Sequence, residues 1–374
     1  MRITAVQPTM FFIHDGDALR QRVQVQVESD GAIGAALSVR GEGVDERIPL
    51  PDLAPGVTEC DAYLPDLRSP LRLSLGLWAG GRLQDERTLD WQPQKHWEVY
   101  LVHYSHHDLG YTDLPGNVLR EHACILDDVV RYCEETRDWP EDSRFHWLVE
   151  QAWSVVQFVE TRPPAEVERL LQAIRRGQIE VTALFGNQTS ELCGHEELIR
   201  LLYPSFRLKR EHGIDVVSAE HNDIPGFSWG LANVLAGAGI RYFSPGIPSW
   251  YFGRGEDRVH PLWDEAAVLE LARPGAFWWE GIDGSRVLLW YDLHGGEWHP
   301  TSYAHALAEL PQLLGDLDEH GYPYDMVSYT LRGGHRDNAP AIPLYAHLAR
   351  QWNARWAYPR LINATNARFL RGFE

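Results

Sequence analysis

The chain has 374 residues, of which 44% are hydrophobic and 23% are charged, and this composition excludes collagen-like and wholly disordered proteins. The length suggests about two domains, one of which can be a large α/β domain. The formal net charge of −19 repels phosphate groups, so we expect neither nucleic acid nor an anionic membrane as a partner.

The sequence carries no targeting segment that we recognise. No stretch approaches the roughly 18 consecutive apolar residues that a membrane helix needs. Residues 1–17 lack the basic head, apolar core and cleavage site of a secretory signal. The four cysteines form no Cys-x-x-Cys pair and are expected to be reduced. We therefore expect a cytoplasmic protein.

Residues 1–95 contain short runs in which apolar and polar residues alternate. Residues 22–27 and 71–77 are the clearest of these runs, and turn-forming clusters follow at 15–17, 29–31 and 79–81. A period of two with frequent turns is typical of an antiparallel β-sandwich. We predict a small accessory domain of this kind over residues 1–95.

Residues 96–374 read as strands that alternate with helices. The expected strands are residues 98–103, 144–149, 179–183, 215–219, 240–243, 285–291, 325–330 and 360–363. The expected helices are residues 117–136, 151–160, 165–176, 195–212, 228–237, 303–319 and 341–354. Repeated βα units predict a parallel sheet, and this number of units predicts an irregular (β/α) barrel of seven or eight strands. Residues 244–284 form a long insertion rich in Trp, Pro and Gly, which we expect to be a functional loop.

Polar residues cluster directly after six of the expected strands. The clusters are residues 104–113, 150–151, 187–191, 220–223, 292–297 and 332–338. In a (β/α) barrel the C-terminal ends of the strands meet at one face, where active sites lie. We therefore expect these clusters to form one site.

His106 and Asp108 are the first candidate metal ligands, because imidazole and carboxylate are common zinc ligands and residues two apart can point the same way. The alternative is a loop that caps the next helix. Asp223 follows a strand and precedes a turn with proline and glycine. Its alternative role is the N-terminal cap of the expected helix at 228–237.

These residues resemble the N-terminal catalytic domain of the family 38 glycoside hydrolases, the retaining α-mannosidases. Residues 105–111, Ser-His-His-Asp-Leu-Gly-Tyr, are similar to the family's His-Ser-His-Asn-Asp-Pro-Gly-Trp motif, with departures at three positions. Residues 223–228, Asp-Ile-Pro-Gly-Phe-Ser, loosely resemble the family's Asp-Pro-Phe-Gly-His-Ser motif. Residues 177–180 and 187–191 resemble a further strand and turn of the family.

The resemblance implies a zinc ion bound by His106, Asp108 and Asp223, with Asp223 also acting as the nucleophile. The family's fourth ligand lies in a His-His-Asp segment beyond the barrel, and no such segment follows residue 338 here. His335 and His294 are our candidates to replace it, with His335 preferred and His294 otherwise a sugar contact. Carboxylate-rich sites also accept cobalt or manganese.

A retaining glycosidase needs a second carboxyl group as the general acid. We predict Asp337 for this role. Its alternative is a structural role, in a salt bridge or as a helix cap. Glu150 is the other candidate for the acid, or else a substrate contact. A mannose-type diol is the sugar that the resemblance implies. The expected contacts to this carbohydrate come from polar and aromatic residues near the site. They are Glu150, Asn187, Glu191, His294, Trp229 and Trp279, and any of the tryptophans could instead belong to the core.

Two other functions fit the same residues. A zinc-dependent sugar deacetylase or amide hydrolase would use metal-activated water and form no glycosyl-enzyme ester. The chain lacks the Asp-Asp and His-x-x-x-His motifs of polysaccharide deacetylases, which disfavours that function. A catalytically inactive, carbohydrate-binding homologue is the third possibility, because the fourth metal ligand of the family is missing.

Overall fold

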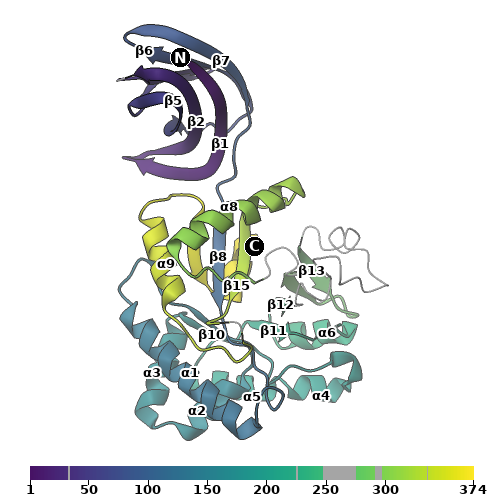
Figure 1. The fold of residues 1–374 in the computed structure, drawn as a ribbon. Coiled ribbons are helices and arrows are strands. Elements are labelled where there is room, and N and C mark those ends of the chain that lie inside the picture. The colour runs from purple at the N-terminus through teal and green to yellow at the C-terminus, as the bar shows by residue number, and fades with distance from the viewer. Residues whose placement is uncertain (33, 225, 247–274, 291–296, 335) are drawn as a thin grey trace. The chain divides into compact units, whose positions relative to one another are not determined.

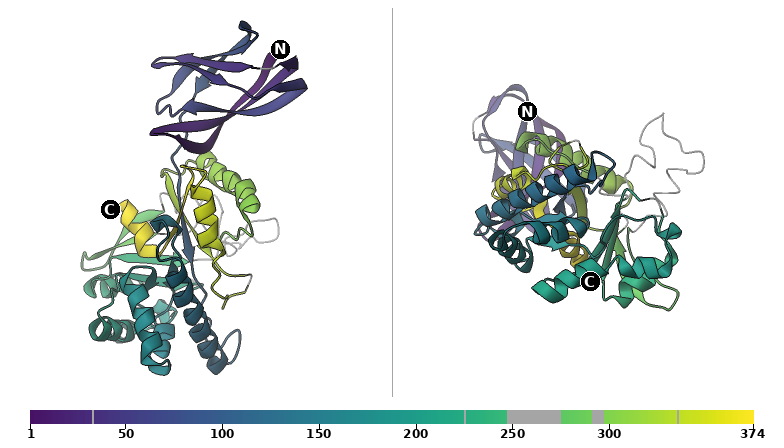
Figure 2. Two further views of the ribbon diagram at one scale, coloured as in Figure 1. Left: turned by 90° about the vertical axis from the view of Figure 1, so that its left-hand side faces the viewer. Right: turned by 90° about the horizontal axis from the view of Figure 1, so that it is seen from below.

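The computed structural model describes all residues except 33, 225, 247–274, 291–296 and 335 (Figures 1 and 2). The chain divides into two compact units. The first contains Met1–Glu98 and Trp352–Arg360, and the second contains Val99–Gln351 and Leu361–Glu374. No helix of the described residues is long and apolar enough to cross a bilayer.

The first unit is built from two antiparallel sheets. Its strands are β1 (Arg2–Asp15), β2 (Ala18–Ala32), β3 (Ala36–Gly41), β4 (Val44–Pro49), β5 (Leu53–Pro65), β6 (Leu71–Ala79) and β7 (Arg82–Trp91). One sheet has the order β1-β2-β5 and the other has the order β4-β3-β6-β7. Alternate residues of β2 and β6 enter one shared core, so the two sheets form a sandwich, as the alternating runs predict.

A short segment near the C-terminus belongs to this first unit. The amide of Phe12 donates to the carbonyl of Tyr358 at 2.8 Å, and Ala357 N donates back to the carbonyl of Phe12 at 2.8 Å. The Phe11 and Trp356 rings lie 4.6 Å apart. This association was not predicted, because it depends on contacts between residues more than 300 positions apart in the chain.

The second unit is a mixed α/β fold with several sheets. Its strands are β8 (Glu98–His103), β9 (Trp147–Val149), β10 (Ile179–Val181), β11 (Ser218–Asn222), β12 (Tyr242–Gly246), β13 (Ala276–Glu280), β14 (Arg286–Trp290), β15 (Met326–Leu331) and β16 (Arg360–Ala364). Its main helices are α1 (Pro115–Glu135), α2 (Trp153–Thr161), α3 (Pro164–Arg175), α4 (His195–Arg200), α5 (Tyr203–His212), α6 (Trp229–Gly237), α8 (Tyr303–Glu319), α9 (Leu344–Asn353) and α10 (Asn366–Leu370). Short 3-10 turns lie at Glu141–Ser143, Ser190–Leu192 and Arg371–Phe373.

The strands of the second unit form three sheets among the described residues, with the orders β15-β8-β16, β10-β9 and β11-β12-β14-β13. The pairs β9–β10, β11–β12 and β12–β14 are parallel, as repeated βα units predict. Single contacts link the sheets: Tyr104 forms a parallel bridge with Leu148, and Ala183 N donates to the carbonyl of Ser218 at 2.8 Å. The mixed α/β fold is confirmed, while the closed barrel stays a prediction.

Several elements differ from the sequence expectation, and three of the differences bear on the architecture. The helix expected at 195–212 is two helices, and α5 has Pro204 in its first turn, where the missing amide hydrogen is tolerated. The insertion expected at 244–284 contains β13, which pairs antiparallel with β14. The strand expected at 215–219 is β11, which runs on through Glu220, His221 and Asn222 because these polar side chains are buried.

The core of the first unit gives a direct stability test. Leu75 on β6 is fully buried, so its replacement by alanine removes apolar contacts and leaves a cavity. We expect Leu75→Ala to lower the free energy of unfolding by roughly 2–5 kcal/mol in urea titrations followed by circular dichroism. Leu83→Ala on β7, where the side chain is 46% exposed, is the matched control and should cost much less. Equal losses in both variants would contradict the assigned core.

Candidate active site

A buried carboxylate lies where several strands of the second unit end. Glu150 follows β9, and its side chain is fully buried. His106 Nδ1 lies 3.0 Å from Glu150 Oε2 and 3.1 Å from Oε1. Asn187 Nδ2 donates to Glu150 Oε1 at 2.8 Å, and Asn222 Nδ2 donates more weakly to Oε2 at 3.5 Å. The structure therefore brings four of the predicted polar clusters together around Glu150.

Asn187 joins the ends of three neighbouring strands. Its Oδ1 accepts from Gln151 Nε2 at 2.7 Å and from the amide of Asn222 at 3.2 Å, while its Nδ2 bonds Glu150. A single amide side chain thus satisfies groups that follow β9 and β11. Because both ends of the Asn187 side chain bond other groups of the protein, Asn187 is better suited to holding the strand ends together than to the predicted contact with a sugar.

The loop with His106 and Asp108 is held by the loop after β15. The amide of His106 donates to the carbonyl of Asp337 at 3.0 Å. Asn338 Oδ1 accepts from the amide of Asp108 at 3.1 Å, and its Nδ2 donates to the Asp108 carbonyl at 3.2 Å. Asn338 therefore pairs with the backbone of Asp108 as another peptide group would. The sequence showed only that Asn338 was polar, so its role was missed.

Two of the predicted metal ligands lie side by side. His106 Nε2 is 3.3 Å from Asp108 Oδ1. Two ligand atoms at about 2.0–2.1 Å from a tetrahedral zinc ion lie roughly this far apart, so the pair fits two coordination positions. Within the described parts of the chain, however, no three or more His, Cys, Asp or Glu side chains lie close enough to hold a metal, so the predicted set of His106, Asp108 and Asp223 is not brought together as one. His335 and His294, the candidates for a further ligand, lie outside the described residues.

The surroundings of His106 strongly favour its protonated form. Burial by itself would lower its pKa, but the charge of Glu150 and the hydrogen bonds to Asp108 and Glu150 raise the pKa to about 11. Metal-free His106 is therefore an imidazolium ion between two carboxylates at neutral pH. A metal ligand must be a neutral imidazole, so a metal at Nε2 takes the place of a proton.

Asp223 directly follows Asn222 at the end of β11 and has an unusual backbone. Its φ of 58° lies in the left-handed region that few residues other than glycine adopt, although aspartate is among those that do. Helix α6 begins at Trp229, and Ser228 occupies its N-cap position. The alternative that Asp223 caps this helix is therefore wrong. Backbone strain of this kind is frequent at functional sites.

Asp337 takes part in a row of charges. Arg332 Nη1 donates to Asp337 Oδ1 at 2.9 Å, and Arg332 Nη2 donates to Glu297 Oε2 at 2.7 Å. The Asp337 side chain is 49% exposed. Burial alone would raise the pKa of Glu297, but the hydrogen bond from His299 and the charge of Arg332 lower it to about 2. Glu297 is thus an anion at neutral pH, and its pairing was missed because Arg332 comes from a different part of the chain.

The remaining predicted residues have other partners in the structure. Glu191 is exposed and approaches Gly226, where a side chain would collide with its carboxylate. Trp229 is 59% exposed and donates from Nε1 to the carbonyl of Glu280 at 2.6 Å. The Trp279 ring stacks on Phe243 at 5.6 Å. Trp229 can still offer a face to a ligand, whereas Trp279 packs against the core.

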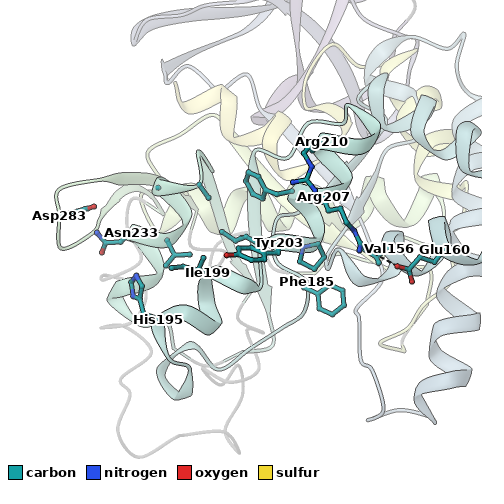
Figure 3. A pocket seen from close by; sticks show the side chains of 16 residues that line it. Val156, Glu160, Phe185, His195, Ile199, Tyr203, Arg207, Arg210, Asn233 and Asp283 are labelled. Atoms are coloured by element: carbon teal, nitrogen blue, oxygen red, sulfur yellow. Dashed lines mark hydrogen bonds and ion pairs between the residues drawn. The ribbon is translucent and has the colours of Figure 1, made fainter.

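A separate pocket of about 1190 Å³ lies among α4, α5 and α6 (Figure 3). Its walls are largely apolar and include Tyr203, Phe206 and Ile199, with Arg207 among the charged residues that line it. None of the predicted catalytic or metal-binding residues lines this pocket.

Comparisons with known proteins agree with the motifs. Residues 96–374 match the sequence model of the glycosyl hydrolases family 38 N-terminal domain. The fold is similar to that of an α-mannosidase from Enterococcus faecalis V583, with a TM-score of 0.56 and 17% identity over 74% of this chain and 29% of that chain. A protein in glycosyl hydrolase family 38 from Enterococcus faecalis has a TM-score of 0.49 and 17% identity over 75% of this chain and 28% of that chain.

This chain therefore spans less than a third of the length of those two proteins. No curated protein matches it in sequence.

His221 provides a test of the electrostatics beside the site. Neither of its ring nitrogens has a hydrogen-bond partner in the described part of the chain, and burial lowers its pKa to about 4. Its unfolded pKa is about 6.5, so the unfolded state binds the proton more readily. The stability that neutral His221 provides is complete above about pH 6.5 and is lost as the pH falls toward 4.

We expect His221→Phe to reduce this acid sensitivity, because Phe227 and Phe243 surround the ring at 6.0 Å and accept an aromatic replacement. The loss of one titrating group should flatten the stability curve by up to about 1.4 kcal/mol per pH unit between pH 6.5 and 4. Urea unfolding at several pH values measures the slope, with pH 8 as the reference. An unchanged slope in the variant would show that His221 is not the titrating group.

Proposed function

The chain belongs to glycosyl hydrolase family 38, and on this basis we propose that it is a glycosidase that cleaves α-mannosides or related α-glycosides with retention of configuration. The observation that carries the proposal is the pairing of His106 and Asp108, the residues that match the family motif, beside the buried Glu150. A carbohydrate is the partner that this function requires, and a cytoplasmic location is part of the same proposal.

We propose that residues 96–374 form the catalytic domain and residues 1–95 an accessory domain. The contacts between Tyr104 and Leu148 and between Ala183 and Ser218 support an irregular barrel, because each joins two of the separate sheets at neighbouring strands. In a barrel, β8, β9, β10 and β11 would follow one another around the wall. Their polar ends would then share one face.

Enzymes of this family are generally zinc-dependent, and we propose that His106, Asp108 and Asp223 hold a zinc ion here. The pair at 3.3 Å supports two of these ligands. Asp223 is proposed as the third from its match to the family motif, because the described residues contain no group of three such side chains close enough to hold a metal. Bound zinc would polarise sugar hydroxyls and stabilise negative charge that develops near them. Side chains of the protein carry out the nucleophilic attack and the proton transfers.

Asp223 is the proposed nucleophile. Its carboxylate would attack the anomeric carbon and form a glycosyl ester as the bond to the leaving oxygen breaks. A carboxylic acid must donate a proton to that oxygen, and the resulting carboxylate then removes a proton from the water that hydrolyses the ester. The protons and bonds balance over the two steps, and the sugar keeps its configuration.

We assign the acid role to Asp337 and not to Glu150. The Asp337 carboxyl is half-exposed, so it can reach a substrate, whereas Glu150 is fully buried. The Arg332 guanidinium pairs with both Asp337 and Glu297, so it holds the Asp337 carboxyl in place at the edge of the site.

The nucleophile can be tested with a fluorinated glycosyl fluoride, whose ester with the enzyme is slow to hydrolyse. We expect wild type to turn over aryl α-mannosides and to gain the mass of one sugar on the peptide that contains Asp223. Asp223→Asn should lower kcat at least 10³-fold and abolish labelling, because an amide is a poor nucleophile. Asp128→Asn on α1, a surface residue that bonds Arg131, is the control and should behave as wild type.

Other outcomes identify the alternative functions. Release of acetate from acetylated sugars without an ester on Asp223 would indicate a deacetylase. Sugar binding without any turnover would indicate an inactive carbohydrate-binding protein.

Metal analysis tests the second part of the proposal. We expect the purified protein to contain about one zinc ion per chain by mass spectrometry of the elements. His106→Ala should lower this content, because it removes the nitrogen that faces Asp108. His14→Ala, at an exposed position of β1, should leave it unchanged. A metal-free wild type, or equal metal in both variants, would contradict the site.

A further inference from the structure

Glu150 has no role in the proposed reaction, yet it is the most deeply buried charge near the site. Its side chain has no exposed surface. A buried carboxylate is costly unless hydrogen bonds and opposite charge compensate for the lost water. The compensating groups here are the His106 ring and the amides of Asn187 and Asn222. Such an arrangement does not suit the predicted roles of Glu150 as substrate contact or acid, because a sugar cannot reach it.

The contacts of Glu150 hold the carboxylate in one orientation. Asn187 bonds Oε1, Asn222 approaches Oε2, and both oxygens face His106 Nδ1. The backbone of Glu150 is also fixed, since Thr182 Oγ1 donates to its carbonyl oxygen at 2.5 Å. Both amide partners are neutral. The negative charge of Glu150 is therefore directed mainly at the imidazole.

The two nitrogens of His106 then have different surroundings. Nδ1 faces Glu150, which accepts a hydrogen bond and so requires the proton on Nδ1. Nε2 faces Asp108 at 3.3 Å. A neutral ring with its proton on Nδ1 has its lone pair on Nε2, directed toward that carboxylate. Histidines that bind metals are commonly oriented in this way by a carboxylate that accepts from their second nitrogen.

We propose that Glu150 is a positioning residue that fixes the ring and tautomer of His106, so that Nε2 binds the zinc ion. This inference rests on the proposed function, because it needs zinc at His106. It adds a role for Glu150 that requires no contact with sugar or metal. Asn187 and Asn222 act one step further out, by orienting the carboxylate.

The chain offers a matched control for a change at Glu150. Glu220 is also a buried carboxylate, on β11, and its Oε2 accepts from Asn366 Nδ2 at 2.7 Å. No hydrogen bond or ion pair between Glu220 and His106 is found among the described residues. A change from carboxylate to amide at Glu220 therefore has the same chemistry without the contact to His106.

The experiment measures zinc affinity of the full chain by competition with a chromophoric chelator. We expect Glu150→Gln to weaken zinc binding about 10–100-fold, the effect typical of lost outer-shell partners, and Glu220→Gln to stay near wild type. Substitution of cobalt for zinc adds a spectroscopic readout, since the visible spectrum should change in Glu150→Gln and not in Glu220→Gln. A purely structural role would alter thermal stability in both variants without moving the spectrum of either.

If Glu150→Gln fails to fold, Glu150→Asp keeps the charge and withdraws it from Nδ1, and it should weaken zinc binding in the same direction. Equal zinc affinity in wild type and the folded Glu150 variant overturns the positioning role and leaves the proposed function standing. Absence of zinc from the wild type overturns the proposed metal site, and this inference with it.

Discussion

The contact between Glu150 and His106 is the constraint on which the site depends. A fully buried carboxylate must find donors, and it finds them on the segments that follow β8, β10 and β11. Each of these segments is fixed at the point where its strand ends. Moving the strand ends apart would leave the buried Glu150 carboxylate without donors, which costs free energy. This penalty keeps the strand ends together.

The loop that contains His106 and Asp108 is held from two sides. On one side the His106 ring bonds Glu150, and on the other side the backbone bonds Asp337 and Asn338. The two catalytic candidates, Asp223 and Asp337, lie next to residues that make these bonds. The backbone of each is therefore anchored by bonds that its neighbours make to this loop or to Glu150.

The sequence predicted the kinds of element well and their interactions less well. Helix α8 begins and ends at the expected residues, 303 and 319, because its apolar period is clear and Ser302 caps it. The end of β11 was placed too early, since a polar sequence gives no sign that its side chains will be buried. His106 and Asp108 were found from their spacing, and their proximity is confirmed.

The sequence could not assign Glu150, Asn187 or Asn338. All three follow strands and are polar, which is what a substrate contact and a framework residue have in common. What separates the two roles is burial and the identity of the partners. Those depend on which loops meet in space. Glu297 was missed for the same reason, since its partner Arg332 belongs to the loop after β15.

The hydrogen bonds around the site form a closed ring that joins the proposed metal ligand to the proposed acid. Its members, in order, are His106, Glu150, Asn222, Tyr104, Glu297, Arg332 and Asp337. The backbone bond from the His106 amide to the Asp337 carbonyl, at 3.0 Å, closes it. Tyr104 is the link between the two charged halves. It accepts from Asn222 at 3.0 Å and donates to Glu297 at 3.3 Å.

The Tyr104 hydroxyl stays protonated within this ring of hydrogen bonds. Burial and the charge of Glu297 raise the pKa of Tyr104 well above its usual value, so its hydroxyl keeps the proton that it donates. Bonds in such a network polarise one another in a low-dielectric interior. Neutral groups, the Asn222 amide and the Tyr104 hydroxyl, therefore join His106 and Glu150 to the charged pair of Glu297 and Arg332. Arg332 in turn bonds the Asp337 carboxylate, and the Asp337 carbonyl bonds the His106 amide, so the positions of His106 and Asp337 depend on one network.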